Sequence, residues 1–411
     1  MADIDALIRD YARLTVHVGV NLQPGQDVLI RADFEHAPVA RAIAVEAYES
    51  GARRVEVVYD DTAVRRAELL HAPEQTLASV PGWRLEQLRE MERDGSAFIR
   101  LTGAADPHVF DGIDPARISI VPEEYVVELR KLMLSGAIPW TVVAAPNAGW
   151  AEQVFGEPDV ERLWEVVAVS MRLDEADVVV AWHTHRATLA ARADTLTTLE
   201  LDKVHYYGPG TDLTVGLLPG SRWVSGSLTS RAGVEYMPNL PTEEVFTSPD
   251  RRRADGTMRL TRPLVMPQQR VMVEGLQVTF EGGRIVDATA EAGLDAVLAE
   301  LDRDPGARSL GEVAIVDRSS RIRQAGVVFH DTLYDENAGS HVAWGQSFSF
   351  VLDGGTDHTQ DELFDLGLNH SQAHTDVVIG GPGVSIDGIS ADGTVTPIVA
   401  DDVWVLPVRG A

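Results

Sequence analysis

The segment Asp331–His341, DTLYDENAGSH, is the stretch around which we expect the fold to be organised. Asp335, Glu336 and His341 place three groups that could bind a metal ion or transfer a proton within one turn of this segment. Asn337 and Gly339 favour turns, so we expect a loop rather than one face of a helix. Apolar runs at 326–329 and 342–350 predict a strand on either side. A loop between buried strands holds its side chains at a fixed place, although an acidic surface turn would have a similar sequence.

Length and composition limit the classes of protein that the chain can belong to. The 411 residues are 45% hydrophobic and 24% charged, which is enough for one large core or two domains. No apolar run reaches the length of a membrane span, and the acidic, amphipathic start MADIDALIRDYARL does not resemble a secretory signal. The absence of cysteine excludes disulfides and thiolate metal sites and fits a reducing compartment, so we expect a cytoplasmic protein.

The formal net charge of −28 bears on partners. A chain this acidic repels the phosphate backbone of nucleic acids and anionic lipid headgroups. We therefore expect binding neither to nucleic acid nor to a membrane. Any metal ion would have to be held by Asp, Glu and His side chains.

The first half of the chain alternates short β-rich runs with helical patterns. The predicted strands are Asp27–Ala32, Val55–Tyr59, Ala97–Leu101, Trp140–Ala145 and Asp177–Ala181. This alternation predicts an α/β domain with a doubly wound parallel sheet over residues 1–195. Neither GxGxxG after the first strand nor GxxxxGK[ST] occurs, so a nucleotide signature is missing. His183 and His185 form an H-x-H pair near the last strand, but they lack an acidic partner at ligand spacing, which favours ordinary polar roles.

The second half is β-rich. The predicted strands are Val204–Tyr207, Asp212–Leu218, Arg222–Ser227, Arg270–Glu281, Arg284–Thr289 and two or three within Val384–Val405. Glu281–Arg284 is a hairpin turn with glycine where a positive φ is needed. Helical signal is limited to about Gly293–Leu301. We expect a mainly antiparallel, β-rich α+β domain over residues 196–411, and we expect it to carry the functional site.

Four short segments of this second half combine acids or histidines with turn residues: Pro241–Pro249, Ser309–Val316, the 331–341 segment and Asn369–Asp376. Glu312 and Asp376 each adjoin an apolar run that should be buried. A buried carboxylate is costly unless it is paired or coordinates a cation. His374 and Asp376 are two residues apart, which puts both on one face of a strand.

The charges of these segments favour two cations. Glu244, Glu312, Glu336 and Asp376 would place four negative charges in one pocket, and two divalent ions would cancel them. His341 and His374 would be neutral ligands. Oxygen-rich sites with one or two imidazoles suit Zn, Co, Mn or Mg, and a pair of such ions supports metal-assisted hydrolysis.

The same segments resemble the signature segments of the M29 family of metallo-aminopeptidases, of the thermophilic aminopeptidase T and S type. The resemblance is carried by PTEEVFTSP, the Glu312 segment, GVVFHDTLYDENAGSHVAWG and HSQAHTD. Three segments of the N-terminal half also resemble this family: YARLTVHVGVNLQPGQDVLI, EAYESGARRVEV and PEEYVVELRKLMLSGAIPW. The likeness covers essentially the whole chain.

The resemblance implies a function and a set of ligands. It implies an aminopeptidase that acts on short peptides with two divalent metal ions (Zn, Co or Mn) and forms a homodimer. The implied metal ligands are Glu244, Glu312, Glu336, His341, His374 and Asp376. Glu243 is the less favoured neighbour of Glu244, and Glu312 matches the carboxylate that bridges the metals. Glu312 and Glu244 are the implied catalytic carboxylates, because one acid of the site shuttles the proton during attack by water.

One position departs from the family pattern and keeps alternatives open. The family often has a tyrosine, thought to assist the reaction, where this chain has Phe348. Loss of a donor to a developing oxyanion costs about 10²–10³ in rate. A mononuclear Fe(II) ring-cleaving dioxygenase on a related fold is one alternative, although it needs fewer carboxylates. A binding protein with a catalytically weakened site is the other.

Overall fold

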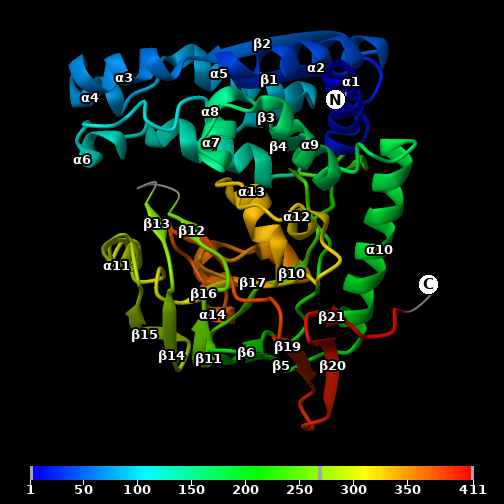
Figure 1. Cartoon of the computed structure of the whole chain (residues 1–411), viewed down its shortest axis with the longest axis vertical. Coiled ribbons are helices and arrows are strands. Elements are labelled where there is room, and N and C mark those ends of the chain that lie inside the picture. The colour runs from blue at the N-terminus through cyan, green and yellow to red at the C-terminus, as the bar shows by residue number, and fades with distance from the viewer. Residues whose placement is uncertain (1–2, 267–270, 409–411) are drawn as a thin grey trace. The chain divides into compact units, whose positions relative to one another are not determined.

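A computed structural model describes residues 3–266 and 271–408 of the chain. The chain divides into two compact units, each made of two segments. The first unit comprises Met1–Thr184 and Ser227–Pro241, and the second comprises His185–Gly226 and Thr242–Ala411. Each unit has its own sheets, so the two are described separately (Figure 1).

A five-stranded sheet in the order β2-β1-β3-β4-β9 forms the centre of the first unit. Its strands are β1 Asp27–Asp33, β2 Arg54–Asp60, β3 Ala97–Thr102, β4 Trp140–Ala144 and β9 Asn239–Leu240. All neighbouring pairs are parallel, which confirms the predicted α/β class for this part of the chain. The strand β9 was not predicted, because two residues distant in sequence carry no periodic signal.

Helices connect and cover these strands. They are α1 Ile4–Leu14, α2 Ala37–Glu49, α3 Thr62–His71, α4 Glu74–Leu77, α5 Gly82–Asp94, α6 Pro115–Ile118, α7 Glu123–Leu134, α8 Ala148–Phe155 and α9 Val160–Ser170, with shorter turns η1 Thr15–Gly19 and η2 Phe34–His36. Leu88 of α5 and Leu132 of α7 join Leu29 and Phe98 of the sheet in one apolar cluster. A small ribbon of β7 Leu228–Thr229 and β8 Glu235–Tyr236 completes the unit.

The strand predicted at 177–181 is wrong, because these residues begin the helix α10 (Val178–Thr198). The run of three valines suggested a strand, but Asp177 Oδ1 accepts hydrogen bonds from the backbone N–H groups of Val179 and Val180 and so starts a helix. Buried residues then recur at helical spacing through Trp182 and Leu189. His183 and His185 consequently lie on a helix rather than at a strand end.

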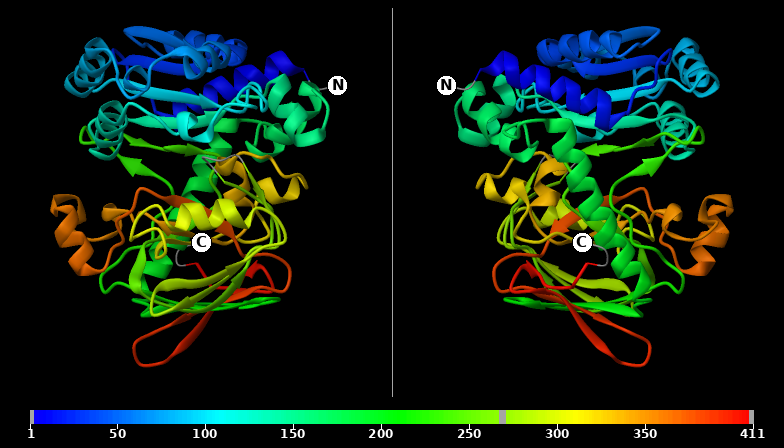
Figure 2. Two further views of the ribbon diagram at one scale, coloured as in Figure 1. Left: turned by 90° about the vertical axis from the view of Figure 1, so that its left-hand side faces the viewer. Right: turned by 90° about the vertical axis from the view of Figure 1, so that its right-hand side faces the viewer.

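The second unit contains two antiparallel sheets, as predicted for the C-terminal half. The larger has the order β15-β14-β11-β6-β5-β19-β20-β21, and the smaller has the order β10-β16-β17-β18. The larger sheet comprises β5 Lys203–Gly208, β6 Thr211–Leu217, β11 Pro249–Arg259, β14 Gln277–Glu281, β15 Arg284–Thr289, β19 Ser385–Ile389, β20 Val395–Ala400 and β21 Val403–Trp404. The smaller comprises β10 Val245–Thr247, β16 Leu310–Ile315, β17 His341–Gly345 and β18 His374–Val378. One apolar cluster draws side chains from both sheets, among them Val215, Phe280, Val313 and Val342. Figure 2 shows the strands of this unit from two further sides.

Short helices and one ribbon fill the connections of this unit. They are β12 Leu264–Val265 with β13 Met272–Val273, α11 Leu294–Leu301, α12 Arg321–Gln324, α13 Thr332–Asp335, η3 Glu336–Ala338, η4 Ser349–Val351, η5 Gly355–Asp357 and α14 Gln360–Leu366. The predicted hairpin turn is confirmed, because Gly282 and Gly283 both have positive φ between β14 and β15.

Several local expectations for this unit are wrong. The segment 331–341 is not a plain loop, since α13 and η3 occupy most of it. Asp331 caps the start of α13, because its side chain accepts a hydrogen bond from the backbone N–H of Leu333. The run at 326–329 is not a strand, and neither is 222–227 apart from a single bridge at Val224. Residue Arg270, the predicted start of a strand, lies outside the described residues. The long strand β11 was missed because charged residues interrupt its alternation.

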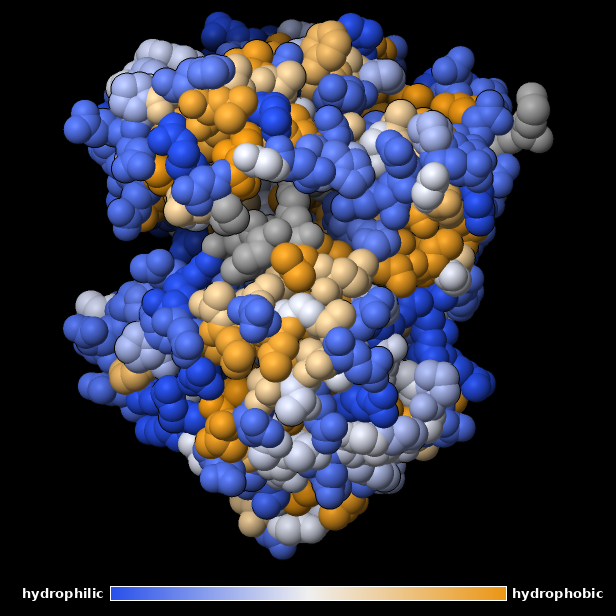
Figure 3. Space-filling view, turned by 60° about the vertical axis from the view of Figure 1, so that its left-hand side comes forward, coloured by the Kyte–Doolittle hydropathy of each residue, from blue (hydrophilic) through white to orange (hydrophobic). Residues whose placement is uncertain are grey.

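The surface agrees with the composition. Figure 3 shows hydrophilic side chains over much of the visible face, with smaller apolar patches between them. Among the described residues, none of the helices combines the length and the apolar character required to cross a bilayer.

Gly345, at the end of β17, is a point where the backbone requires glycine. Its φ is +102°, and a Cβ added there would lie 2.2 Å from the carbonyl oxygen of Ala373 on the adjacent segment. We expect Gly345→Ala to lower the free energy of unfolding by about 3 kcal/mol or more, measured by urea denaturation. Gly393→Ala is the control, since its φ is +87° but nothing lies within 4 Å. Equal losses in the two variants would contradict this explanation.

Candidate metal centre

The four strands of the smaller sheet bring acids and histidines from distant segments to one face. Glu312 lies on β16, His341 on β17, and His374 and Asp376 on β18, while Glu244 directly precedes β10. In the register of the sheet Glu312 pairs with Ala343, and Ala343 pairs with Asp376. Directly paired residues share a face, and so do residues two apart along a strand. The polar side chains therefore lie on one face, and Val313, Val342 and Val377 point into the apolar core on the other.

Two alanines leave room between these side chains. Ala343 lies between Glu312 and Asp376 in its row, and Ala314 pairs with His341 in the next row. Both alanines are fully buried. Larger residues at these two central positions would fill the space over the sheet into which the acids and imidazoles project. The sequence offered no signal for this role, because alanine is common in buried strands.

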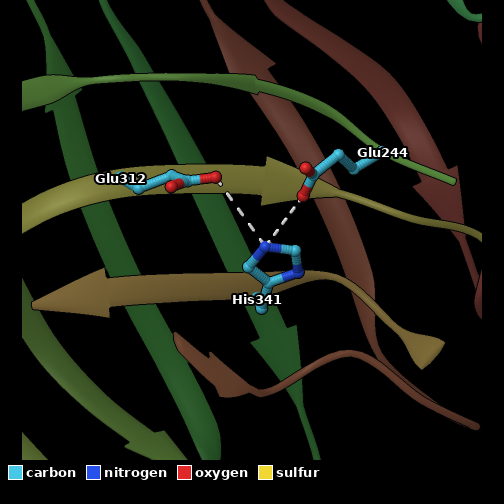
Figure 4. Close-up of side chains that lie close together, drawn as sticks. All are labelled: Glu244, Glu312 and His341. Carbon is cyan, nitrogen blue, oxygen red and sulfur yellow. Dashed lines mark ion pairs between the residues drawn. The ribbon is translucent and has the colours of Figure 1, made fainter. Parts of the chain in front are cut away.

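The first group of candidate ligands is Glu244, Glu312 and His341, with one ligand atom from each residue lying within 4.8 Å of the others. Nε2 of His341 is 3.0 Å from Oε2 of Glu244 and 3.8 Å from Oε1 of Glu312 (Figure 4). All three side chains are buried. Figure 4 shows them converging from three different segments, with the imidazole nitrogen facing both carboxylates.

The second group shares one residue with the first. Glu312, His374 and Asp376 also have ligand atoms within 4.8 Å of one another. Nε2 of His374 is 3.3 Å from Oε2 of Glu312 and 3.6 Å from Oδ1 of Asp376. The two carboxylate oxygens of Glu312 thus face different histidines, because Oε1 is the atom nearest His341.

Both histidines are oriented by backbone carbonyls. Nδ1 of His341 donates to the carbonyl oxygen of Gly339 at 3.1 Å, and Nδ1 of His374 donates to that of Gln346 at 2.9 Å. A carbonyl only accepts, so Nδ1 carries the proton in each ring. In the neutral imidazoles the Nε2 lone pairs then point at the carboxylates, which is the arrangement typical of histidines that bind metal.

Glu336 and Asn337 connect the site to η3. The Glu336 carboxyl forms a hydrogen bond with the Asp376 carboxyl. The side-chain amide of Asn337 donates to Oε1 of Glu336 at 3.3 Å, and its oxygen accepts from the backbone N–H of Glu243 at 2.7 Å. Asn337 therefore links the segments of Glu244 and Glu336, a role that sequence reasoning missed. Glu336 and Asp376 also line a small cavity bounded in part by Arg262 and Leu264.

Glu243 points away from this cluster. Its Oε2 lies 3.4 Å from Nε2 of His185, and the same nitrogen donates to the carbonyl oxygen of Thr242 at 2.9 Å. His185 thus contacts the neighbour of a candidate ligand and does not join the cluster itself. Asp335 accepts hydrogen bonds from the backbone N–H groups of Phe329 and Asp331 and so supports α13.

Burial and mutual repulsion shift the pKa values of the acids. Burial, reinforced by the charges of Asp376 and Glu244, holds the pKa of Glu336 well above its usual range. Burial also raises the pKa of Glu244 and of Asp376. Burial opposes ionisation of Glu312 as well, but the adjacent imidazoles of His341 and His374 outweigh it and lower its pKa to about 2. Metal-free protein therefore has to hold protons on some of these acids.

The histidines take the opposite shift. Burial lowers the pKa of His374, but the charge of Asp376 and the hydrogen bond to Glu312 outweigh it and raise the pKa to about 9. The pKa of His341 is likewise raised well above its usual range, against the effect of burial, by Glu244 and Glu312. Without a cation, protons on the imidazoles supply the positive charge that the carboxylates require.

The donor set fits a divalent cation in each group. Oε2 of Glu244 is buried and has no hydrogen-bond partner among the described residues, although it faces His341. Carboxylate oxygens and imidazole nitrogens with fixed tautomers are the ligands that Zn, Co and Mn accept. The structure thus brings together all six residues singled out in the sequence.

A buried acid and imidazole cluster of this kind, in a chain that has a β-rich unit and a parallel α/β unit, is typical of a metal-dependent enzyme. Comparison with known proteins places it among the peptidases. Residues 4–404 match the family model Peptidase_M29, described as thermophilic metalloprotease (M29), and the chain belongs to this family. The predicted family and the predicted enzyme class, a metal-dependent peptidase, are confirmed.

Its relatives are similar over their whole length. Aminopeptidase T of Thermus aquaticus is 38% identical over 402 residues, which span 96% of this chain and 97% of the relative. Aminopeptidase 2 of Geobacillus stearothermophilus is 36% identical over 401 residues, 96% of each chain. The solved structure of wild-type AmpT from Thermus thermophilus matches with a TM-score of 0.90 and 36% identity, over 98% of this chain and 100% of that one.

The pKa shifts predict how pH affects the metal-free protein. Raised pKa values of Glu336 and of His374, the latter about 9, mean that the folded state binds more protons than the unfolded chain between about pH 5 and pH 9. Its stability should therefore fall as pH rises through this range, measured by urea denaturation with chelator present. The low pKa of Glu312 acts only below this window.

Saturating divalent cation should diminish that fall, because bound cations replace the protons of the site. Part of the pH dependence of stability should remain, since burial and the charge of Asp335 raise the pKa of Asp331, which lies outside the cluster, to about 7. Stability that is independent of pH in chelator would contradict the proposed electrostatics.

Proposed function

We propose that this aminopeptidase removes the N-terminal residue of short peptides with two divalent cations, Zn, Co or Mn, held by Glu244, Glu312, Glu336, His341, His374 and Asp376. The observation that carries the proposal is that Glu312 belongs to both ligand groups, with one carboxylate oxygen toward each histidine. A carboxylate shared in this way suits a bridge between two ions. The remaining acids supply enough negative charge to neutralise both.

The metal pair, when bound, polarises the peptide carbonyl and lowers the pKa of an attacking water. The residues of the chain then have separate tasks. The backbone carbonyls of Gly339 and Gln346 keep the histidine tautomers fixed. Oε2 of Glu244 is buried and has no hydrogen-bond partner among the described residues. We therefore propose that Glu244 and Glu312 are the carboxylates that take the proton from water and pass it to the leaving amine.

Several relatives support peptides as substrates. The Thermus aquaticus and Geobacillus stearothermophilus proteins are both named as aminopeptidases and cover nearly the whole chain. Family membership favours hydrolysis over the ring-cleaving dioxygenase, and the presence of all six candidate ligands argues against a weakened binding protein. Homodimer formation, a cytoplasmic location and the domain boundary between residues 195 and 196 stay predictions.

Phe348 bears on the rate. Its ring lies 5.3 Å from the ring of His374, so the position where the family often has tyrosine adjoins the second ligand group without offering a hydroxyl. Another group must donate to the developing oxyanion, or turnover is lower by the factor expected for one lost donor, about 10²–10³.

Metal content tests the number of ions. We expect close to two divalent ions per subunit by elemental analysis after dialysis against Zn, Co or Mn, because two ligand groups share Glu312. Chelator should abolish the release of N-terminal residues from dipeptides, and added cation should restore it. A single iron without a second metal would favour the dioxygenase instead.

Glu312→Gln tests the shared ligand. This change removes one charge and keeps the shape, so we expect kcat/KM to fall about 10³-fold or more, as a loss of several kcal/mol implies. The fold, followed by circular dichroism, should persist. Glu243→Gln is the matched control, since the adjacent buried acid points toward His185, and at least about a tenth of the activity should remain. An active Glu312→Gln variant would refute the bridging role.

A further inference from the structure

Among the candidate ligands on β16, β17 and β18, the side chain of His374 is the most accessible. Its side chain is 29% exposed, compared with 1% for His341 and 6% for Glu312. Asp376 and Glu244 are nearly as buried as Glu312. On this face of the sheet, His374 is therefore the ligand that a bound peptide can contact most directly.

Aromatic side chains line that side. The ring of Phe348 packs edge-to-face against His374 at 5.3 Å and stacks on the ring of Phe350 at 5.3 Å. Phe246 contacts Phe348 and Phe350 at 5.7 and 6.3 Å. We call Phe246, Phe348 and Phe350 the aromatic wall. Phe246 is buried, whereas Phe348 and Phe350 are half-buried, so part of each outer ring is left to contact something else.

The wall is held in place by the same strands that hold the ligands. Phe246 on β10 pairs with Ala314, which pairs with His341, so the Phe246 ring lies on the ligand-bearing face of the sheet. The backbone N–H of Phe348 donates to Oγ of Ser248 at 2.9 Å. The short helix η4 then fixes Phe350. A preorganised apolar surface beside a reaction centre is suited to selecting substrates.

The cluster is flanked by two different environments. On the side of Glu336 and Asp376 lies the small cavity, which has charged residues such as Arg262 and Asp331 in its wall. On the side of His374 lies the half-exposed aromatic wall. An exopeptidase substrate has one residue on the amino side of the scissile bond and the rest of the chain on the other. The half-exposed wall suits the continuing chain, whose first side chain after the scissile bond would contact the rings of Phe348 and Phe350.

We propose that the aromatic wall is a subsite for an apolar side chain at the second residue of the peptide, the one that follows the scissile bond. This inference rests on the proposed function, because it takes the cluster to be the place of hydrolysis. Transfer of a leucine-sized side chain from water onto the rings stabilises the bound transition state, whereas serine gains little. Contacts of this kind change kcat/KM by about 10- to 200-fold.

Dipeptides that differ at the second residue test the subsite in the metal-loaded full-length enzyme. We expect kcat/KM for Ala-Leu to exceed that for Ala-Ser by about 10-fold or more. Phe350→Ala should reduce this ratio to about 3 or less, and Phe350→Leu should restore most of it, because leucine keeps the surface apolar. The ratio cancels any general loss of turnover or metal, since both dipeptides undergo the same chemistry.

Two controls separate the subsite from other effects. Phe364→Ala removes another partly exposed phenylalanine, one that packs on Arg251, and should leave the ratio unchanged. The ratio for Leu-anilide over Ser-anilide, which varies only the first residue, should be the same in wild type and in Phe350→Ala.

The inference would be overturned if Phe350→Ala left the Ala-Leu to Ala-Ser ratio of kcat/KM unchanged, or if it changed only the ratio for the anilides. Hydrolysis of the dipeptides would still support the proposed function in either case. Absence of metal-dependent hydrolysis of every dipeptide would refute the proposed function instead.

Discussion

Uncompensated negative charge in a buried place is the constraint on which the second unit depends. Glu244, Glu312 and Asp376 are nearly inaccessible to water, and Glu312 has a ligand atom within 4.8 Å of one from each of the other two acids. Such a cluster is costly in a low-dielectric interior unless protons or cations neutralise it. The shifted pKa values of the two histidines and of Glu336 show protons serving that purpose in the metal-free chain. Divalent cations would serve it better, because each supplies two charges at a fixed point.

The β architecture allows this charge to be concentrated without loss of the core. Alternation along each strand sends valines into the apolar cluster and sends acids and imidazoles to the opposite face. Ala314 and Ala343 keep the centre of that face open. Backbone carbonyls of Gly339 and Gln346, which cost no additional side chain, set the histidine tautomers. Phe246 of the aromatic wall lies on the same face, so the proposed subsite and the candidate ligands are held by one sheet.

Much of this arrangement could be predicted from the sequence, and the limits have physical causes. The alternation of apolar runs and helices predicted the parallel α/β sheet, and the acids next to apolar runs predicted the cluster. The start of helix α10 was predicted as a strand because three consecutive valines favour a strand, whereas the helix depends on capping by Asp177. The roles of Asn337 and Ala343 could not be predicted, since both depend on partners from segments that are distant in sequence. Register and three-dimensional proximity carry that information, and local composition does not.

The central claim is that Glu312 is shared between two cations. Crystals of the enzyme soaked with Mn or Zn, measured at the absorption edge of the metal, test it most directly. The account predicts two anomalous peaks, one among Glu244, Glu312 and His341 and the other among Glu312, His374 and Asp376. A single peak that does not contact Glu312, or peaks only at surface acids, would contradict it.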